Sequence, residues 1–275
     1  MFRALTLALL GLSGLAVSAA AQSRQDPQLI FSIGAGLAAG SGELWSLSEQ
    51  GVTVVGGTGF DTLGLARWMR PGVVAALSAT YHRSRHLGLT AEAGYFGIAT
   101  EERCTPPAGG YKTDSENKNA QACSSAQGNH VPTSVVGFQV GFTYRFSAGG
   151  RYEPYVRASG GMGFLANSFV RTDGGIRAPL ACSQTGGVCQ WPLMEGESTS
   201  EQAIIGTLAV GSSVTFAPGY RFRFEVRDLI VSLPLPSGPA NPATGIAPVG
   251  STMKHIPVFT AGLDVVLERR RGRRY

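Results

Sequence analysis

The sequence predicts an all-β fold, an eight-stranded antiparallel up-and-down transmembrane β-barrel, and it leaves room for ten strands. Three observations predict this class. Eight segments alternate apolar with small or polar side chains, which is the pattern of a strand with one apolar face. The links between those segments alternate strictly between short and long. After the first 21 residues, no run reaches the roughly 18 consecutive apolar residues that a spanning helix needs.

The N-terminus has the three parts of a secretory signal. Arg3 supplies the positive charge, residues 5–17 form a short apolar stretch, and small residues at 18–21 allow cleavage before Gln22. The apolar stretch is shorter than the roughly 20 residues of a membrane anchor. We therefore expect residues 1–21 to be a cleaved signal peptide, 22–268 to form the barrel and 269–275 to be a basic periplasmic tail.

The strand pattern is clearest in two segments, 87–95 and 136–146. Along 87–95 every odd position is apolar, and the last of them is the aromatic Tyr95, whereas the even positions are small, polar or charged. Along 136–146 the even positions are all apolar or aromatic. Six further segments follow the same rule with less contrast: 29–37, 73–81, 156–164, 204–216, 221–227 and 259–267.

The links give the stronger indication of topology. Three are hairpin-sized and contain turn residues, at 83–85, 147–151 and 217–219. The other four are long, at about 39–70, 100–132, 166–201 and 233–253. This order is expected of a barrel with both termini in the periplasm, short turns there and long loops outside. The first long link holds the apolar stretch 51–56, which predicts an extra hairpin or longer flanking strands.

Four cysteines fall in two local pairs inside the second and third long links. In an exported protein such pairs indicate disulfides, here Cys104 with Cys123 and Cys182 with Cys189. Their spacing is not that of a zinc site, so we expect no metal and no cofactor.

With these strands laid out, the chain resembles the small outer-membrane β-barrel family, of the OmpA-like and OmpW-like type (the outer membrane protein beta-barrel domain group). The resemblance covers the mature chain and rests on LGLTAEAGYFG (87–97), YEPYVRASGGMGF (152–164), YRFRFEVRDL (220–229) and PVFTAGLDVVL (257–267). It implies outer-membrane lipid as surroundings and the barrel-assembly machinery as a partner during biogenesis. The family's last strand usually ends the chain on an aromatic residue, whereas here Tyr275 is separated from the strand by an arginine-rich tail.

A set of charged residues falls on the inward face of the predicted strands by parity. Since an eight-stranded barrel is filled by side chains, these charges are expected to pair with one another in a lumen charge network. The alternative is a polar path that passes small solutes and favours anions, because arginines outnumber carboxylates. The set comprises Glu92, Arg145, Arg157, Arg223, Glu225, Arg227 and Asp264.

No motif indicates catalysis. Neither GxSxG nor HExxH occurs, and His82 and His86 flank a periplasmic turn, whereas His130 and His255 lie toward the loops. We therefore expect no enzyme.

The net charge of +5 comes largely from five arginines in the last seven residues, so no nucleic-acid partner is expected. Aromatic residues gather at the strand ends as an interfacial belt: Tyr81, Tyr144 and Phe146 at one end, Tyr95, Phe96 and Phe164 at the other.

These features predict a protein of the bacterial outer membrane with a structural or surface-interaction role and long bridged extracellular loops, in contact with cell-wall or surface partners. The alternative function is a narrow porin or a carrier of small hydrophobic molecules. A rim enzyme and a secreted soluble β-sandwich are the other classes that the pattern leaves open.

Overall fold

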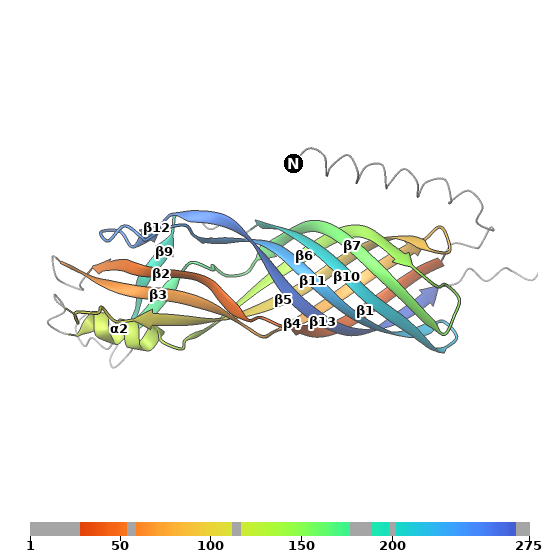
Figure 1. Ribbon diagram of the computed structural model, residues 1–275, viewed down its shortest axis with the longest axis horizontal. Coiled ribbons are helices and arrows are strands. Elements are labelled where there is room, and N and C mark those ends of the chain that lie inside the picture. The colour runs from red at the N-terminus through yellow and green to blue at the C-terminus, as the bar shows by residue number, and fades with distance from the viewer. Residues whose placement is uncertain (1–27, 54–58, 112–116, 177–188, 198–201, 268–275) are drawn as a thin grey trace, which may run out of the picture.

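Eight strands close into a ring in the computed structural model, which describes residues 28–53, 59–111, 117–176, 189–197 and 202–267. Every neighbouring pair is antiparallel, and the last strand pairs with the first, so the predicted eight-stranded barrel is confirmed (Figure 1). In ring order the strands are β1 (Gln28–Ala38), β4 (Gly72–His82), β5 (Leu87–Thr105), β6 (His130–Arg145), β7 (Tyr152–Leu165), β10 (Gln202–Ala217), β11 (Tyr220–Pro236) and β13 (Val249–Leu267).

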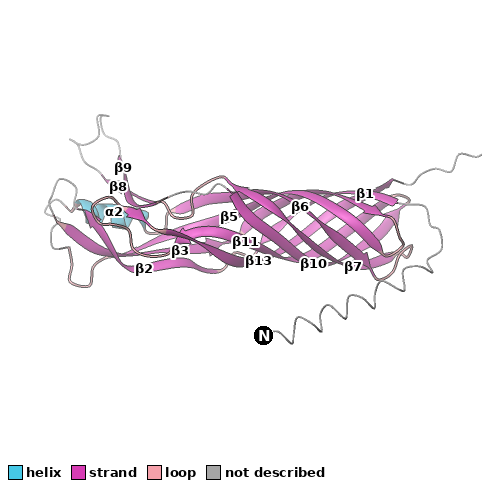
Figure 2. Ribbon diagram, turned by 90° about the horizontal axis from the view of Figure 1, so that it is seen from above, coloured by secondary structure: helices cyan, strands magenta, loops and turns pink. Residues whose placement is uncertain are grey.

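The two ends of the barrel differ as the link lengths predict. One end, called here the turn end, carries the short links 83–86, 146–151 and 218–219. Gly219 has a φ of +81° in the tightest of these, a left-handed conformation that glycine adopts without strain. The opposite end, the loop end, carries all four long links (Figure 1). The strands run obliquely between the two ends (Figure 2).

The ring has an apolar outside and a polar inside, as β6 shows. Its even positions from Val136 to Tyr144 are exposed, whereas the odd positions from Gly137 to Arg145 are buried. The exposed side chains are apolar and the buried ones are small or polar, which is the reverse of the distribution in a soluble protein. Most of the exposed apolar side chains of the ring form what we call the apolar belt: Phe31, Ile33, Leu37, Val73, Leu77, Tyr81, Leu87, Leu89, Tyr95, Val136, Phe138, Val140, Phe142, Tyr144, Val156, Met162, Phe164, Ile204, Leu208, Val210, Phe216, Tyr220, Phe222, Phe224, Val226, Phe259 and Leu267.

An extra hairpin extends the barrel at the loop end. It consists of β2 (Gly42–Thr53) and β3 (Phe60–Arg70), and β3 pairs with the last third of β5, from Ala99 to Thr105 (Figure 1). The ring itself keeps eight strands, because β2 and β3 pair outside it. This hairpin is the one that the apolar stretch 51–56 predicted, although residues 54–58 lie outside the described residues.

The loop end is more ordered than the predicted link boundaries imply. The link after β5 holds α2 (Lys118–Ala126), the next holds β8 (Thr172–Ile176) and β9 (Cys189–Gly196), and the last holds β12 (Ile246–Ala247). The boundaries 233–253 were wrong, since β11 continues to Pro236 and β13 already begins at Val249. Within the described residues, no helix has the length and apolar character to cross a membrane.

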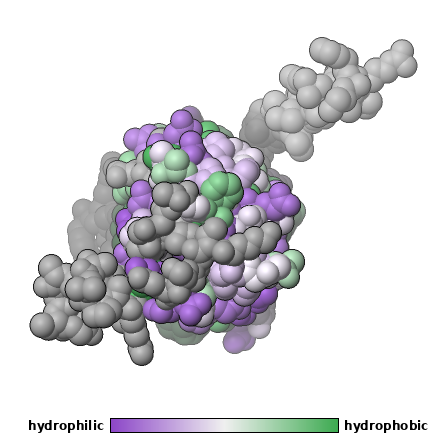
Figure 3. Space-filling model, turned by 90° about the vertical axis from the view of Figure 1, so that its left-hand side faces the viewer, coloured by the Kyte–Doolittle hydropathy of each residue, from purple (hydrophilic) through white to green (hydrophobic). Residues whose placement is uncertain are grey.

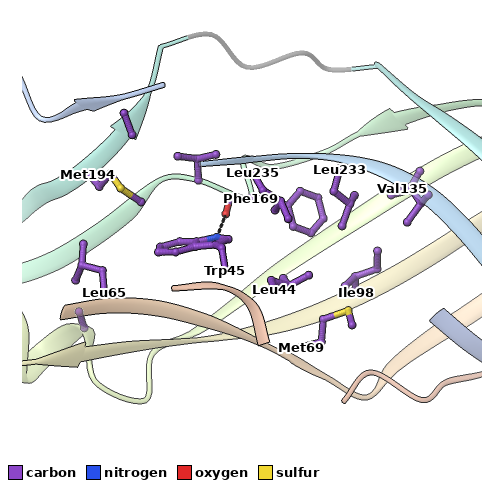
Figure 4. Packing of buried hydrophobic residues seen from close by; sticks show 14 of the residues in the cluster. Leu44, Trp45, Leu65, Met69, Ile98, Val135, Phe169, Met194, Leu233 and Leu235 are labelled. Carbon is purple, nitrogen blue, oxygen red and sulfur yellow. Dashed lines mark hydrogen bonds between the residues drawn. The ribbon is translucent and has the colours of Figure 1, made fainter. Parts of the chain in front are cut away.

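The inward side of β11 changes character halfway along the strand. Arg221, Arg223, Glu225 and Arg227 face the lumen toward the turn end, and Leu229, Val231, Leu233 and Leu235 follow on the same face toward the loop end. The loop-end half of the interior is thus a packed apolar core, in which Trp45, Phe169, Leu233 and Leu235 lie close together (Figure 4). Phe96 also points into this core and is 1% exposed, so its predicted place in the interfacial belt was wrong.

Candidate functional site in the barrel lumen

The structure places the side chains of the predicted lumen charges inside the ring. Each of the seven predicted residues faces the interior, and none is more than 6% exposed. They come from five strands: Glu92 from β5, Arg145 from β6, Arg157 from β7, Asp264 from β13, and Arg223, Glu225 and Arg227 from β11. The alternation that places apolar side chains on the outside therefore places these seven charged side chains on the inside.

Four of these residues form a closed tetrad of alternating charges. Arg157 Nη1 lies 2.8 Å from Glu92 Oε2, and its Nη2 contacts Glu225. Arg227 Nη1 lies 2.7 Å from Glu92 Oε1, and its Nη2 lies 2.7 Å from Glu225 Oε1. Each carboxylate thus bridges two guanidinium groups, and the Tyr155 hydroxyl donates to Glu225 Oε2 at 2.7 Å. Pairing of this kind offsets the cost of burying charge.

A pair and a triad lie nearer the turn end. Arg223 Nε is 3.7 Å from Asp264 Oδ1, and Ser213 donates to Asp264 Oδ2 at 2.9 Å. The triad consists of Arg145, Arg221 and Glu153, whose Oε2 lies 3.2 Å from Arg145 Nη1 and 2.5 Å from Arg221 Nη1. The other carboxylate oxygen of Glu153 accepts from the backbone N–H of Gly149 at 2.7 Å, which ties the triad to a turn.

Sequence reasoning missed two members of the triad. Glu153 shares strand parity with Arg157, but the predicted strand began only at residue 156. Arg221 lies on the inward face of the predicted strand together with Arg223, but it was not included in the predicted network. Extending the strand that began at 156 back to its turn would have found Glu153, and strand parity alone identifies Arg221.

Hydroxyl groups fill part of the remaining interior. Thr90 Oγ1 lies 3.0 Å from Thr80 Oγ1 and 2.8 Å from Thr143 Oγ1, so a line of threonines crosses three strands. Ser159 donates to Gln139 at 3.0 Å on the same inner surface. Together with the charges, these groups occupy the turn-end half of the lumen.

A further buried ion pair, which lies outside the apolar belt, stabilises the loop end. Arg67 on β3 contacts Glu102 on β5 and donates to the carbonyl oxygens of Ser168, at 3.1 Å, and Arg171. Burial lowers the pKa of Arg67 and raises the pKa of Glu102, while their mutual attraction opposes both shifts. Beside them, Trp45 Nε1 donates to Phe169 O at 2.9 Å (Figure 4). These hydrogen bonds attach the third long link, at residues 168–171, to the extra hairpin.

One predicted disulfide is present. Cys104 at the end of β5 is bonded to Cys123 in α2, with Cα atoms 5.3 Å apart. The predicted partner of Cys189, Cys182, lies outside the described residues, as do the signal peptide and the basic tail.

The histidines are scattered over the molecule. His82 is buried at the turn end, and His86 Nδ1 lies 2.7 Å from the carbonyl oxygen of Arg145. At the loop side of the belt, exposed His255 Nδ1 lies 2.7 Å from Asp228 Oδ2. His130 is exposed at the start of β6. Among the described residues no group of three or more metal-ligating side chains occurs.

A closed ring with an apolar outside and a charged inside defines a small transmembrane β-barrel. No family model and no curated protein matches the sequence. The fold is similar to Neisserial surface protein A (13% identity, 88% of this chain and 99% of that chain, TM-score 0.38). It is also similar to the outer membrane protein OprG of Pseudomonas aeruginosa (10% identity, 90% of this chain and 99% of that chain, TM-score 0.44). A third similar structure is the outer membrane protein AlkL (13% identity, 92% of this chain and 95% of that chain, TM-score 0.38).

Proposed function

We propose that this chain is a structural barrel of the bacterial outer membrane, with a lumen closed along its length and a folded, disulfide-bridged cap presented outside the cell. The observation that carries the proposal is that side chains of two kinds occupy the interior. The tetrad, pair and triad occupy the turn-end half, and the apolar core occupies the loop-end half.

The membrane location is supported by the surface of the ring. The apolar belt encircles all eight strands, and an exposed apolar surface of this extent is stable only against lipid or another apolar surface. The N-terminal signal pattern supports export, and exported barrels of this type reside in the outer membrane.

The cap supports a role in surface interaction. The loop end combines the hairpin β2–β3, α2 and β8–β9 around buried contacts from Arg67 and Trp45. Viewed end-on, its described surface is dominated by hydrophilic side chains with small apolar patches between them (Figure 3). A polar surface of this kind suits contact with the surroundings of the cell.

Single-channel recording in planar bilayers tests the closed lumen. The mature chain is expected to give no reproducible openings, with insertion verified in the same preparation by heat-modifiable migration on gels. Reproducible conductance steps would overturn the structural proposal and favour the narrow porin. Anion-selective steps in particular would indicate that the ion pairs rearrange to form a path.

The carrier of small hydrophobic molecules is the second candidate, and the apolar loop-end core is the observation that favours it. In that case the core must open to admit a ligand. Trp45 lies in this core and is 7% exposed, so its fluorescence reports on opening. A saturable change in emission on titration with small hydrocarbons is expected of a carrier, whereas a closed structural barrel should give none.

A further inference from the structure

The lumen charges do not balance locally. The tetrad holds two arginines and two carboxylates, and Arg223 with Asp264 holds one of each. The triad holds two arginines, Arg145 and Arg221, around the single carboxylate of Glu153. Among the described residues one positive charge is therefore left over, and it is located at the triad.

This uncompensated charge is buried. The side chains of Arg145 and Arg221 are 6% and 11% exposed. Arginine keeps its proton at any ordinary pH, so the excess cannot be removed by deprotonation. A buried charge without a counter-charge is costly, which makes this a place where an anion would be held.

A small cavity lies beside the triad. It has a volume of about 30 Å³ and is lined by polar groups that include Arg145, Glu153, Arg221, Arg223, Asp264 and His82. One donor atom on its wall, Arg145 Nε, has no hydrogen-bond partner, and Arg145 is more than nine-tenths buried. One acceptor, Asp264 Oδ1, is also without a hydrogen bond.

We propose that this cavity is a binding site for one small monatomic anion of the halide class, which neutralises the excess arginine of the triad. A single water needs about 10–15 Å³ of such space, so the cavity has room for a halide and one water but is too small for phosphate or sulfate. The halide lies toward Arg145 and Arg221. The water lies toward Asp264, whose free oxygen would repel an anion and whose 3.7 Å separation from Arg223 suits a bridging water.

The inference rests on the proposed closed lumen, because an open channel would screen the triad with mobile ions. Entry is expected from the turn end, where the triad is joined to the 146–151 turn through Gly149. The tests of the two proposals are separate. A barrel without conductance and without an anion disproves only the site, whereas a conducting barrel with an ordered anion disproves only the closed lumen.

Anomalous scattering from crystals of the mature barrel grown in sodium bromide tests the site directly. The expected result is a bromide peak inside the cavity, within contact distance of the Arg145 and Arg221 guanidinium groups. Absence of a peak there, with bromide ordered elsewhere on the same molecule, would overturn the proposal in favour of water alone.

A variant pair supplies the second measurement. Arg221→Gln removes the excess charge and is expected to abolish both the peak and the rise in unfolding temperature when chloride replaces gluconate, an anion too large for the cavity, at equal ionic strength. Arg151→Gln removes an exposed arginine at the same end and should keep both. A chloride effect that persists unchanged in Arg221→Gln contradicts the site, and if this variant does not fold, the bromide map of the unaltered chain decides alone.

Discussion

At the scale of single residues, Glu225 is the centre of the lumen network. Its carboxylate contacts Arg157 and Arg227 and accepts from Tyr155, and the residue is 1% exposed. Because these contacts are buried, removing its charge leaves a guanidinium group poorly compensated.

Glu225→Gln keeps the shape of this side chain and removes its charge. We expect the free energy of unfolding in detergent to fall by about 3–5 kcal/mol, the range for breaking a buried pair. Urea titration followed by heat-modifiable migration measures it. Glu195→Gln is the control, because Glu195 lies 3.9 Å from Arg171 in an exposed pair and should change stability little. Equal effects of the two substitutions would contradict the buried network.

Glu101 gives a pH-dependent prediction at the loop end. Hydrogen bonding to Arg70 holds the pKa of this carboxyl below its ordinary value. A lowered pKa means that the folded state favours the charged form, so the stabilisation is present above the unfolded pKa of roughly 4.3 and is lost as the pH falls further. The difference in unfolding temperature between the unaltered chain and Glu101→Gln should therefore exist at pH 7 and shrink toward pH 3. A difference that grows on acidification would contradict this assignment.

At the scale of elements, β5 shows why the strands could be predicted and their outer ends could not. Up to Tyr95 one face of β5 is exposed and apolar, so the sequence alternates. Beyond it, β3 packs alongside and both faces are largely buried, which removes the alternation and leaves the run Glu101-Glu102-Arg103 with the composition of a loop. At the end of β11, Pro234 and Pro236 give the sequence the composition of a link, so the strand was predicted to end too early.

The disulfide between Cys104 and Cys123 is expected to hold α2 against β5. It closes a separation of 19 residues, for which loop-closure entropy gives a stabilisation of about 3 kcal/mol. Changing both cysteines to serine should speed proteolytic cleavage within 106–129 and leave the ring resistant. Ser124→Ala, at an exposed position of α2, is the control. Loss of heat-modifiable migration in the double variant would instead show that the ring itself depends on the disulfide.

At the scale of the whole molecule, the chain reverses the usual distribution of side chains, with apolar residues outside and charges inside. That reversal could be predicted, because residues on β6 alternate throughout and the short and long links fix which end carries the loops. The local imbalance of charge could not, because it depends on which strands the ring brings together and on Glu153 and Arg221 beside Arg145.

The central claim is that this ring spans a lipid bilayer with its apolar belt toward the acyl chains. Single cysteines carrying a spin label along 138–143 of β6, in reconstituted vesicles, test it most directly. We expect collision with dissolved oxygen to be high at Phe138, Val140 and Phe142 and low at Gln139, Gly141 and Thr143, a period of two. High accessibility of the even positions to a water-soluble relaxation agent instead of oxygen would contradict the claim.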